Sequence, residues 1–187
     1  MAQSSYYSYS PLDGPDTIRL LVIEADDKIP GQIKCRLEHF NISEAPSYTA
    51  LSYVWGDGSH KSRIHLDGQV CEVGQNLFQA LWHLRGYSRE TTWIWIDALC
   101  IDQRNILERN HQVRLMGRIY ETAVKVIIWL GWTDSESDKK SQGAMSYLMQ
   151  MRKETTENIC DLSKFVELCN LPYWYRMWIV QEMGLAK

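Results

Sequence analysis

The chain has 187 residues, of which 45% are hydrophobic and 23% charged, and this balance predicts one globular domain with a substantial core. The formal net charge of -3 argues against a general nucleic-acid-binding protein, which needs clustered Lys and Arg to contact phosphates. No apolar run approaches the roughly 20 residues of a membrane-spanning helix. We therefore expect a cytoplasmic protein with neither a membrane nor a specific nucleic acid as its partner.

The five cysteines are scattered, and no pair has the CxxC spacing of a zinc site or a redox motif. An odd number of cysteines without a signal peptide is typical of reduced thiols in a cytosolic protein. Neither a metal nor a resident cofactor is expected. The chain also contains eight tryptophans, which either fill the core as large apolar residues or line a cleft.

The N-terminal third of the chain predicts a short arm followed by strands. Residues 1–17 are rich in Ser, Tyr, Pro and Gly, and we expect a flexible or draped arm before a domain spanning residues 18–187. The apolar run 18–23 predicts a strand. Residues 32–40 alternate between apolar and polar side chains, which predicts a half-buried strand antiparallel to the first. Residues 48–56 predict a third strand.

A hairpin and a helix are predicted next. Asp67 and Gly68 separate two alternating runs within residues 62–73, which is the strongest short hairpin signal in the chain, and we expect this hairpin at the periphery. Residues 76–85 then follow a helical period, with Asn76 as a candidate N-cap. The apolar side chains of this helix that share one face are Leu77, Ala80, Leu81 and Leu84.

The second half of the chain alternates between strands and helices. Residues 91–100 and 124–131 are predicted to be fully buried strands that lie next to each other, and residues 106–123 a helix between them, with Leu107, Val113, Met116 and Tyr120 on one face. A polar linker precedes a Met-rich helix at residues 144–154. Two further helices are expected at the end, separated by Pro172.

Strands that alternate with helices predict a parallel sheet, in which ligands bind beyond the carboxyl ends of the strands. Carboxylates, amides and flat aromatic faces that converge there could bind a nucleotide-like ligand. The last carboxylate of the group, Glu182, could stabilise positive charge on a ribose. The polar and aromatic candidates at these ends are Ser52, Tyr53, Trp55, Gly56, Asp57, Asp97, Cys100, Gln103, Trp178 and Glu182.

Each candidate also has a purely structural interpretation. Asp97 could simply accept backbone N–H groups at a turn, and Cys100 could be a small buried apolar residue. Glu182 could lie on a helix surface and pair with Arg176. The chain contains no GxGxxG, P-loop, HExxH or GxSxG motif that would decide between these interpretations.

Three separate blocks of the sequence resemble a known family. YTALSYVWGD, the run from WIWIDALCIDQ to VKVIIWLG, and WYRMWIVQE are similar to the signature blocks of the fungal heterokaryon-incompatibility domain, called HET. The resemblance covers about residues 12–186 and implies a part in fungal non-self recognition and programmed cell death, a form of innate immunity. HET domains are thought to be related to TIR domains, many of which cleave NAD.

The relationship implies an α/β fold: a TIR-like (flavodoxin-like), mostly parallel central sheet flanked by helices, with extra N-terminal strands and a β-hairpin. TIR active-site helices often read Trp-x-x-x-Glu, and Trp178 and Glu182 have this spacing. Glu182 is thereby implied to be catalytic and to lie in a solvent-reachable cleft. Trp55 or Tyr53 would stack on a ring of the ligand. A Met-rich segment that TIR domains lack separates this helix from the preceding strand.

Two functions follow from the resemblance. The first is an NAD glycohydrolase whose partner is NAD or a related dinucleotide, taken as substrate rather than cofactor. The second is a non-catalytic death-signalling adaptor that acts by homotypic self-assembly. Both imply a homo-oligomer.

Overall fold

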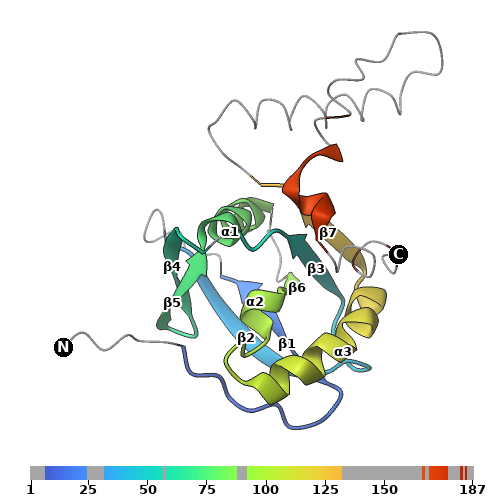
Figure 1. Cartoon of the computed structure of the whole chain (residues 1–187). Helices are drawn as coiled ribbons and strands as arrows, with labels where there is room; N and C mark the ends of the chain where they lie inside the picture. Colours follow the sequence, from blue (N-terminus) through green and yellow to red (C-terminus); the bar gives the residue numbers. More distant parts are fainter. Residues whose placement is uncertain are drawn as a thin grey trace.

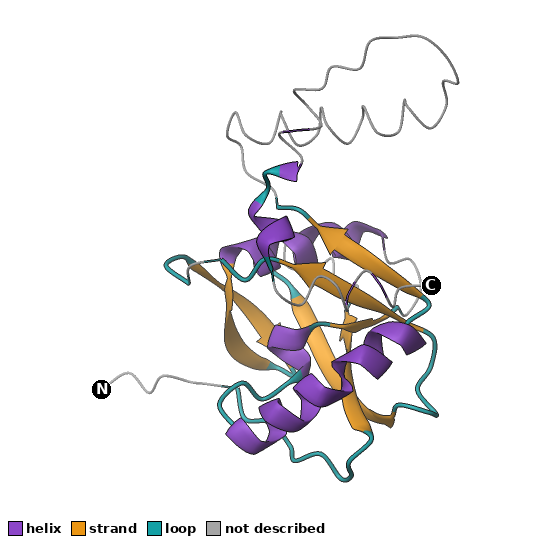
Figure 2. Ribbon diagram, turned by 45° about the vertical axis from the view of Figure 1, so that its right-hand side comes forward, coloured by secondary structure: helices purple, strands orange, loops and turns teal. Residues whose placement is uncertain are grey.

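The computed structural model describes residues 7–24, 32–56, 58–87, 92–131, 166, 169–176, 182 and 184. A seven-stranded sheet forms the centre of these residues, with the strand order β5-β4-β2-β1-β6-β3-β7. Helices cover both of its faces (Figures 1 and 2). The elements are β1 (Thr17–Ile23), β2 (Lys34–Asn41), β3 (Tyr48–Tyr53), β4 (Lys61–Leu66), β5 (Gln69–Gly74), α1 (Gln75–Tyr87), β6 (Trp93–Trp95), α2 (Asp97–Cys100), α3 (Ile106–Thr122), β7 (Lys125–Trp129) and the short 3-10 helix η1 (Pro172–Tyr175).

The N-terminal strands and the hairpin form one half of the sheet. β1 and β2 are antiparallel, as predicted, with Leu21 opposite Leu37. The β4–β5 hairpin turns at Asp67 and Gly68, whose φ angles of 48° and 74° are both positive, as the tight two-residue hairpin turn requires. β5 is the outer strand at this edge, so the predicted peripheral hairpin is confirmed.

The other half of the sheet is parallel. β3 pairs in parallel with both β6 and β7, and it therefore lies between them. The two crossovers carry α1 over one face and α3 over the other (Figures 1 and 2). This half agrees with the parallel sheet expected from the helix–strand alternation.

The sheet as a whole is mixed, so the prediction of a mostly parallel sheet is wrong. β1 runs antiparallel to both of its neighbours, and β4 runs antiparallel to β5. The reason is local: no helix lies between β1 and β2 or between β4 and β5, and parallel neighbours need a long crossover, usually a helix, to connect them.

Two predictions about the buried strands are also wrong. β6 and β7 are not neighbours, because the α3 crossover passes back over β3, and this leaves β7 at the sheet edge with partly exposed side chains. The strand predicted over 91–100 ends at Trp95. The chain turns into α2 instead, with the Cys100 N–H donating to the Ile96 carbonyl and the Ala98 N–H to the Asp97 side chain.

The helical faces largely follow the sequence pattern. Leu77, Ala80 and Leu81 of α1 are buried as predicted. Asn76 is not an N-cap, however, because α1 begins one residue earlier. Its side chain instead donates to the Val54 carbonyl at 2.7 Å and accepts from the Trp129 indole at 2.8 Å, which fastens α1 to the ends of β3 and β7.

α3 forms as predicted and is capped by Asn105, whose side chain accepts a hydrogen bond from the Glu108 N–H. Its buried face includes Met116 and Tyr120, which the periodicity placed there. Leu107, predicted on the same face, is 82% exposed because it lies in the first turn, beyond the edge of the core.

Residues 7–16 run along the α2 and α3 side of the sheet. The Tyr7 hydroxyl donates to Asp67 in the hairpin turn at 2.5 Å, and the Tyr9 hydroxyl donates to the Leu99 carbonyl of α2 at 3.0 Å. These contacts join the N-terminal segment to two distant elements.

Arg19 of β1 is a second connection between these elements. Its side chain is 1% exposed, and its two terminal nitrogens lie 2.5 Å and 3.1 Å from the two carboxylate oxygens of Glu108. The guanidinium also donates to the carbonyls of Cys100 and Ser10. One buried cation therefore holds β1, α2, α3 and the N-terminal segment together.

Other predictions fall wholly or partly outside the described residues. They are the Met-rich helix at 144–154 and most of the final helices. Of the final helices, the structure describes η1, with Pro172 in its first turn, and a few single residues. None of the helices that the structure describes is both long and apolar enough to span a bilayer. The cysteines in the described parts, Cys35, Cys71, Cys100 and Cys169, are all free thiols.

Candidate functional site

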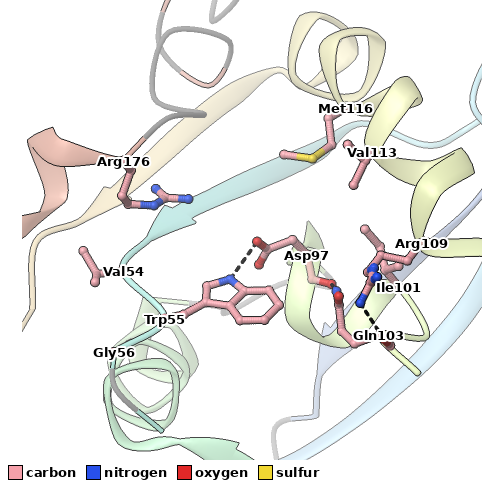
Figure 3. Close-up of a pocket in the computed structure, with 10 residues that line it drawn as sticks. All are labelled: Val54, Trp55, Gly56, Asp97, Ile101, Gln103, Arg109, Val113, Met116 and Arg176. Atoms are coloured by element: carbon pink, nitrogen blue, oxygen red, sulfur yellow. Dashed lines mark hydrogen bonds between the residues drawn. The ribbon is translucent and has the colours of Figure 1, made fainter. Parts of the chain in front are cut away.

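A pocket of about 530 Å³ opens where the parallel strands β3 and β6 end. Its lining is largely apolar, but several polar and charged groups point into it, as Figure 3 shows. This is the edge of the sheet where the sequence predicted a ligand site. The lining residues are Val54, Trp55, Gly56, Asp97, Ile101, Gln103, Arg109, Val113, Met116 and Arg176.

A hydrogen-bonded pair forms the centre of the pocket. The Trp55 indole N–H donates to Asp97 Oδ2 at 2.8 Å, which fixes the plane of a ring that is 47% exposed. Gln103 Nε2 donates to the Asp97 backbone carbonyl at 2.8 Å and so ties the loop after α2 to the same place. Gly56, directly after the tryptophan, has a φ of 79°, a left-handed backbone conformation that glycine adopts without a steric penalty.

The Asp97 carboxyl is the acidic group of the pocket. Burial raises its pKa to about 6, and the charge of Glu182 also raises it. The hydrogen bonds from Trp55 and from the Ala98 N–H, together with the charge of Arg176, act in the opposite direction. Asp97 thus changes its charge close to the physiological range, and it can both accept and donate a hydrogen bond there.

Behind one wall of the pocket lies a buried ionic network. The two terminal nitrogens of Arg176 donate to the two carboxylate oxygens of Glu182, each at 2.7 Å. Ser52 Oγ donates to the same carboxylate, accepts from Arg176 at 3.1 Å, and lies 2.5 Å from the Tyr173 hydroxyl. The Glu182 side chain has no exposed surface, whereas Arg176 is 17% exposed.

This arrangement corrects one expectation about Glu182. Its carboxylate does not lie in a solvent-reachable cleft in the observed conformation, because Arg176 and Ser52 enclose it. Arg176 itself lines the pocket. The guanidinium therefore separates the predicted catalytic carboxylate from the space that a ligand would occupy.

The structure brings together four of the predicted site residues: Trp55, Gly56, Asp97 and Gln103 line the pocket. Ser52 belongs to the Glu182 network instead. Asp57 and Trp178 lie outside the described residues.

Tyr53 and Cys100 are predicted site residues that lie in the core rather than on the pocket wall. Tyr53 is 2% exposed, and burial, with a further contribution from the Asp97 charge, raises the pKa of its hydroxyl. Cys100 is fully buried, and burial raises the pKa of its thiol to about 12. A thiol that stays protonated at neutral pH is a poor nucleophile, so Cys100 fits the structural interpretation.

Three lining residues from α3 were not among the predicted site residues. Arg109, Val113 and Met116 follow i, i+4, i+7 spacing and so share one face of the helix. The signal was available in principle, because α3 follows β6 after only α2 and a short loop, so its first turns must pass the strand ends. Periodicity alone assigned Val113 and Met116 to the core face.

No group of three or more His, Cys, Asp or Glu side chains in the described residues could hold a metal ion. Comparisons with known proteins identify the family of this chain. The family model described as "Heterokaryon incompatibility protein (HET)" matches residues 48–182, from the start of β3 to the buried glutamate. The chain belongs to the heterokaryon incompatibility family.

A curated relative supports the same assignment. Heterokaryon incompatibility protein 6, OR allele, from Neurospora crassa is 34% identical over 169 residues, which is 84% of this chain and 24% of the relative. The chain thus spans about a quarter of the length of that protein. No solved structure gives a significant match. The resemblance to HET domains seen in the three sequence blocks is therefore confirmed, and the pocket lies inside the matched HET segment.

Proposed function

We propose that this HET domain is a cell-death effector of non-self recognition and that it cleaves NAD in the pocket at the ends of β3 and β6. The observation that carries the proposal is the pocket itself. It combines a fixed, exposed indole, a carboxyl that titrates near neutral pH, and an arginine whose partner is a buried glutamate. These are the groups needed to hold a ring, a sugar and a developing charge.

The strand order supports a TIR-like site. β3 lies between β6 and β7, and the chain visits them in the order β3, β6, β7. The first three strands of flavodoxin-like sheets have the same arrangement, and their ligands bind where the connection reverses direction across the central strand. The pocket lies at the carboxyl end of β3, the central strand of the three, beside the residues that follow β3 and β6.

The proposed reaction breaks the bond between ribose C1′ and the nicotinamide nitrogen. Nicotinamide leaves with the bonding electron pair, which neutralises its positive ring nitrogen. Positive charge then develops on C1′, where Glu182 stabilises it, and water adds to C1′ and releases a proton. The products are ADP-ribose, nicotinamide and one proton. Asp97 hydrogen-bonds a sugar hydroxyl, and Trp55 stacks on a ring.

For Glu182 to reach the ribose, Arg176 has to turn its guanidinium away from the carboxylate. Arg176 already lines the pocket and retains some exposed surface, so a movement toward the ligand is sterically available on that side. In this proposal the observed conformation is the closed form of the site.

The test is nicotinamide release from NAD by the purified chain at high protein concentration. Glu182→Gln keeps the shape and removes the charge, and we expect a rate loss of roughly a hundredfold or more. Glu121→Gln is the matched control, because Glu121 is exposed on α3 away from the pocket and should leave the rate unchanged. Thermal melting of each variant has to show that the protein is folded at the assay temperature.

A wild-type chain that releases no nicotinamide in this assay contradicts the proposal. So does a folded Glu182→Gln variant that keeps full activity.

The second candidate function is a non-catalytic adaptor that acts by homotypic self-assembly. The observation that favours it is the burial of Glu182, which has no exposed surface and is fully paired in the observed conformation. Light scattering over a concentration series, combined with a cell-killing assay, distinguishes the two candidates. An adaptor kills when it assembles even with Glu182→Gln, whereas the proposed enzyme does not.

A further inference from the structure

The pocket contains two arginines whose electrostatic situations differ. Arg176 gives both terminal nitrogens to Glu182, so its charge is already balanced. Arg109 has no carboxylate partner among the described residues, and its guanidinium makes only a long contact of 3.4 Å to the Gln103 carbonyl. The pocket therefore has an unbalanced positive charge at the α3 side.

The charged groups lie in different parts of the pocket. Figure 3 shows Arg109 and Gln103 on one side, Arg176 on the other, and Trp55 with Asp97 between them. The negative group of the pocket, Asp97, has its electrostatic interactions with Arg176 and Glu182. An anionic part of a ligand is repelled by Asp97 and attracted to the Arg109 side.

From this asymmetry we infer that Arg109 is the phosphate-binding residue of the pocket and that the ligand is a phosphorylated nucleotide rather than a nucleoside. The phosphate group binds Arg109 beside Gln103, a ring stacks on Trp55, and the sugar lies near Asp97. Arginine suits this role because its planar fork can donate two hydrogen bonds to phosphate oxygens. The inference deepens the proposed function and rests on the same pocket, since it assigns one end of the proposed dinucleotide.

The experiment compares two probes, ADP-ribose and adenosine, in calorimetric titrations of the full chain; ADP-ribose carries a diphosphate and a second ribose that adenosine lacks, and the Arg109 variants isolate the contribution of the phosphates. ADP-ribose lacks the bond that would be cleaved, so binding is measured without catalysis. We expect wild type to bind ADP-ribose at least tenfold tighter than adenosine, because a charge-assisted hydrogen bond to phosphate is lost with adenosine. Arg109→Gln should remove most of this preference, and Arg109→Lys should keep part of it.

Arg114→Gln is the matched control. Arg114 is also exposed on α3 but does not line the pocket, so its loss changes the net charge equally without touching the ligand. An Arg109→Gln variant that prefers ADP-ribose as strongly as wild type overturns the inference. So does an equal loss of preference in Arg114→Gln, or a wild-type chain that does not bind ADP-ribose.

This test separates the inference from the proposed function. A phosphate preference that depends on Arg109, in a chain that releases no nicotinamide, supports the inference and contradicts the NAD cleavage. Nicotinamide release with an unchanged KM for NAD in Arg109→Gln supports the NAD cleavage and contradicts the role of Arg109 in phosphate binding.

Discussion

The buried pair of Arg176 and Glu182 makes a quantitative prediction about stability. Glu182→Gln removes a negative charge that has no exposed surface and leaves a guanidinium that is only 17% exposed. Breaking a buried ion pair by removing one partner costs about 3–5 kcal/mol, whereas an exposed pair contributes about 0–1 kcal/mol. Because Arg176 retains some contact with water, we expect the lower end, about 3 kcal/mol.

A double-mutant cycle isolates the pair from the rest of the network. Arg176→Met leaves the carboxylate without its cation, and we expect a loss of similar size, about 3 kcal/mol. The double variant has neither charge, so it should be more stable than the sum of the single losses implies, by about 2 kcal/mol. The measurement is the free energy of unfolding from equilibrium urea denaturation at neutral pH for all four proteins.

Two results would refute this reasoning. One is a Glu182→Gln variant that loses less than about 1 kcal/mol, which is the value of an exposed pair. The other is simple additivity in the cycle, which would show that the two side chains do not interact in solution. The predicted loss also sets a condition on the activity test, because a variant that melts several degrees lower has to be assayed well below its melting temperature.

Three further predictions concern other parts of the molecule. The raised pKa of Asp97 means that the folded protein holds this proton more tightly than the unfolded chain, so its contribution to stability is present at low pH and is lost as the pH rises through about 6. The stability of Asp97→Asn relative to wild type should therefore increase between about pH 4 and pH 7 in urea titrations; a constant difference would contradict this. Arg19→Met should reduce the free energy of unfolding by about 3–5 kcal/mol, because among the described residues the Glu108 carboxylate then keeps only the Asp102 N–H as a hydrogen-bond donor, and a loss below about 1 kcal/mol would argue against the buried pair. Gly68→Ala should lower the melting temperature because φ is 74° in the hairpin turn, while Gly86→Ala near the end of α1, where a methyl group meets nothing within 4 Å, should not lower it.

The sequence predicted the elements better than their arrangement. The hairpin at Asp67 and Gly68 was predictable because its turn chemistry is local, and α1 and α3 were predictable from their periodicity. The interior position of β3 was not predictable, because it depends on whether the α3 crossover places β7 beside β6 or beside β3. A run such as KVIIW is equally compatible with a central strand and with an edge strand that is covered only on one side.

The location of the site was predictable from local sequence signals, whereas the contacts among its side chains were not. Trp55 and Asp97 come just after the ends of β3 and β6, so the rule for strand ends finds them, whereas Gln103 follows α2 and was found only because the predicted strand extended to residue 100. The burial of Glu182 was not predictable from spacing, because it depends on Arg176, whose side chain could equally have extended into solvent. Tyr53 was misplaced because neighbours in sequence alternate between pocket and core at the end of a strand. Cys100 was misplaced because the predicted strand turns into α2 after Trp95, and Cys100 is buried in that helix.

The place of β1 in the sheet has a practical consequence for work on this family. The family match begins at residue 48, yet β6 lies between β3 and β1, and Leu21 is paired with Ile94 across that boundary. A fragment that begins at residue 48 would lack β1. The hydrophobic edge of β6, which is inside the complete sheet, would then be exposed, and Glu108 would lose its partner Arg19. The segment that the family model matches is therefore smaller than the unit that folds. Expression boundaries for related HET domains should be chosen upstream of the strand equivalent to β1.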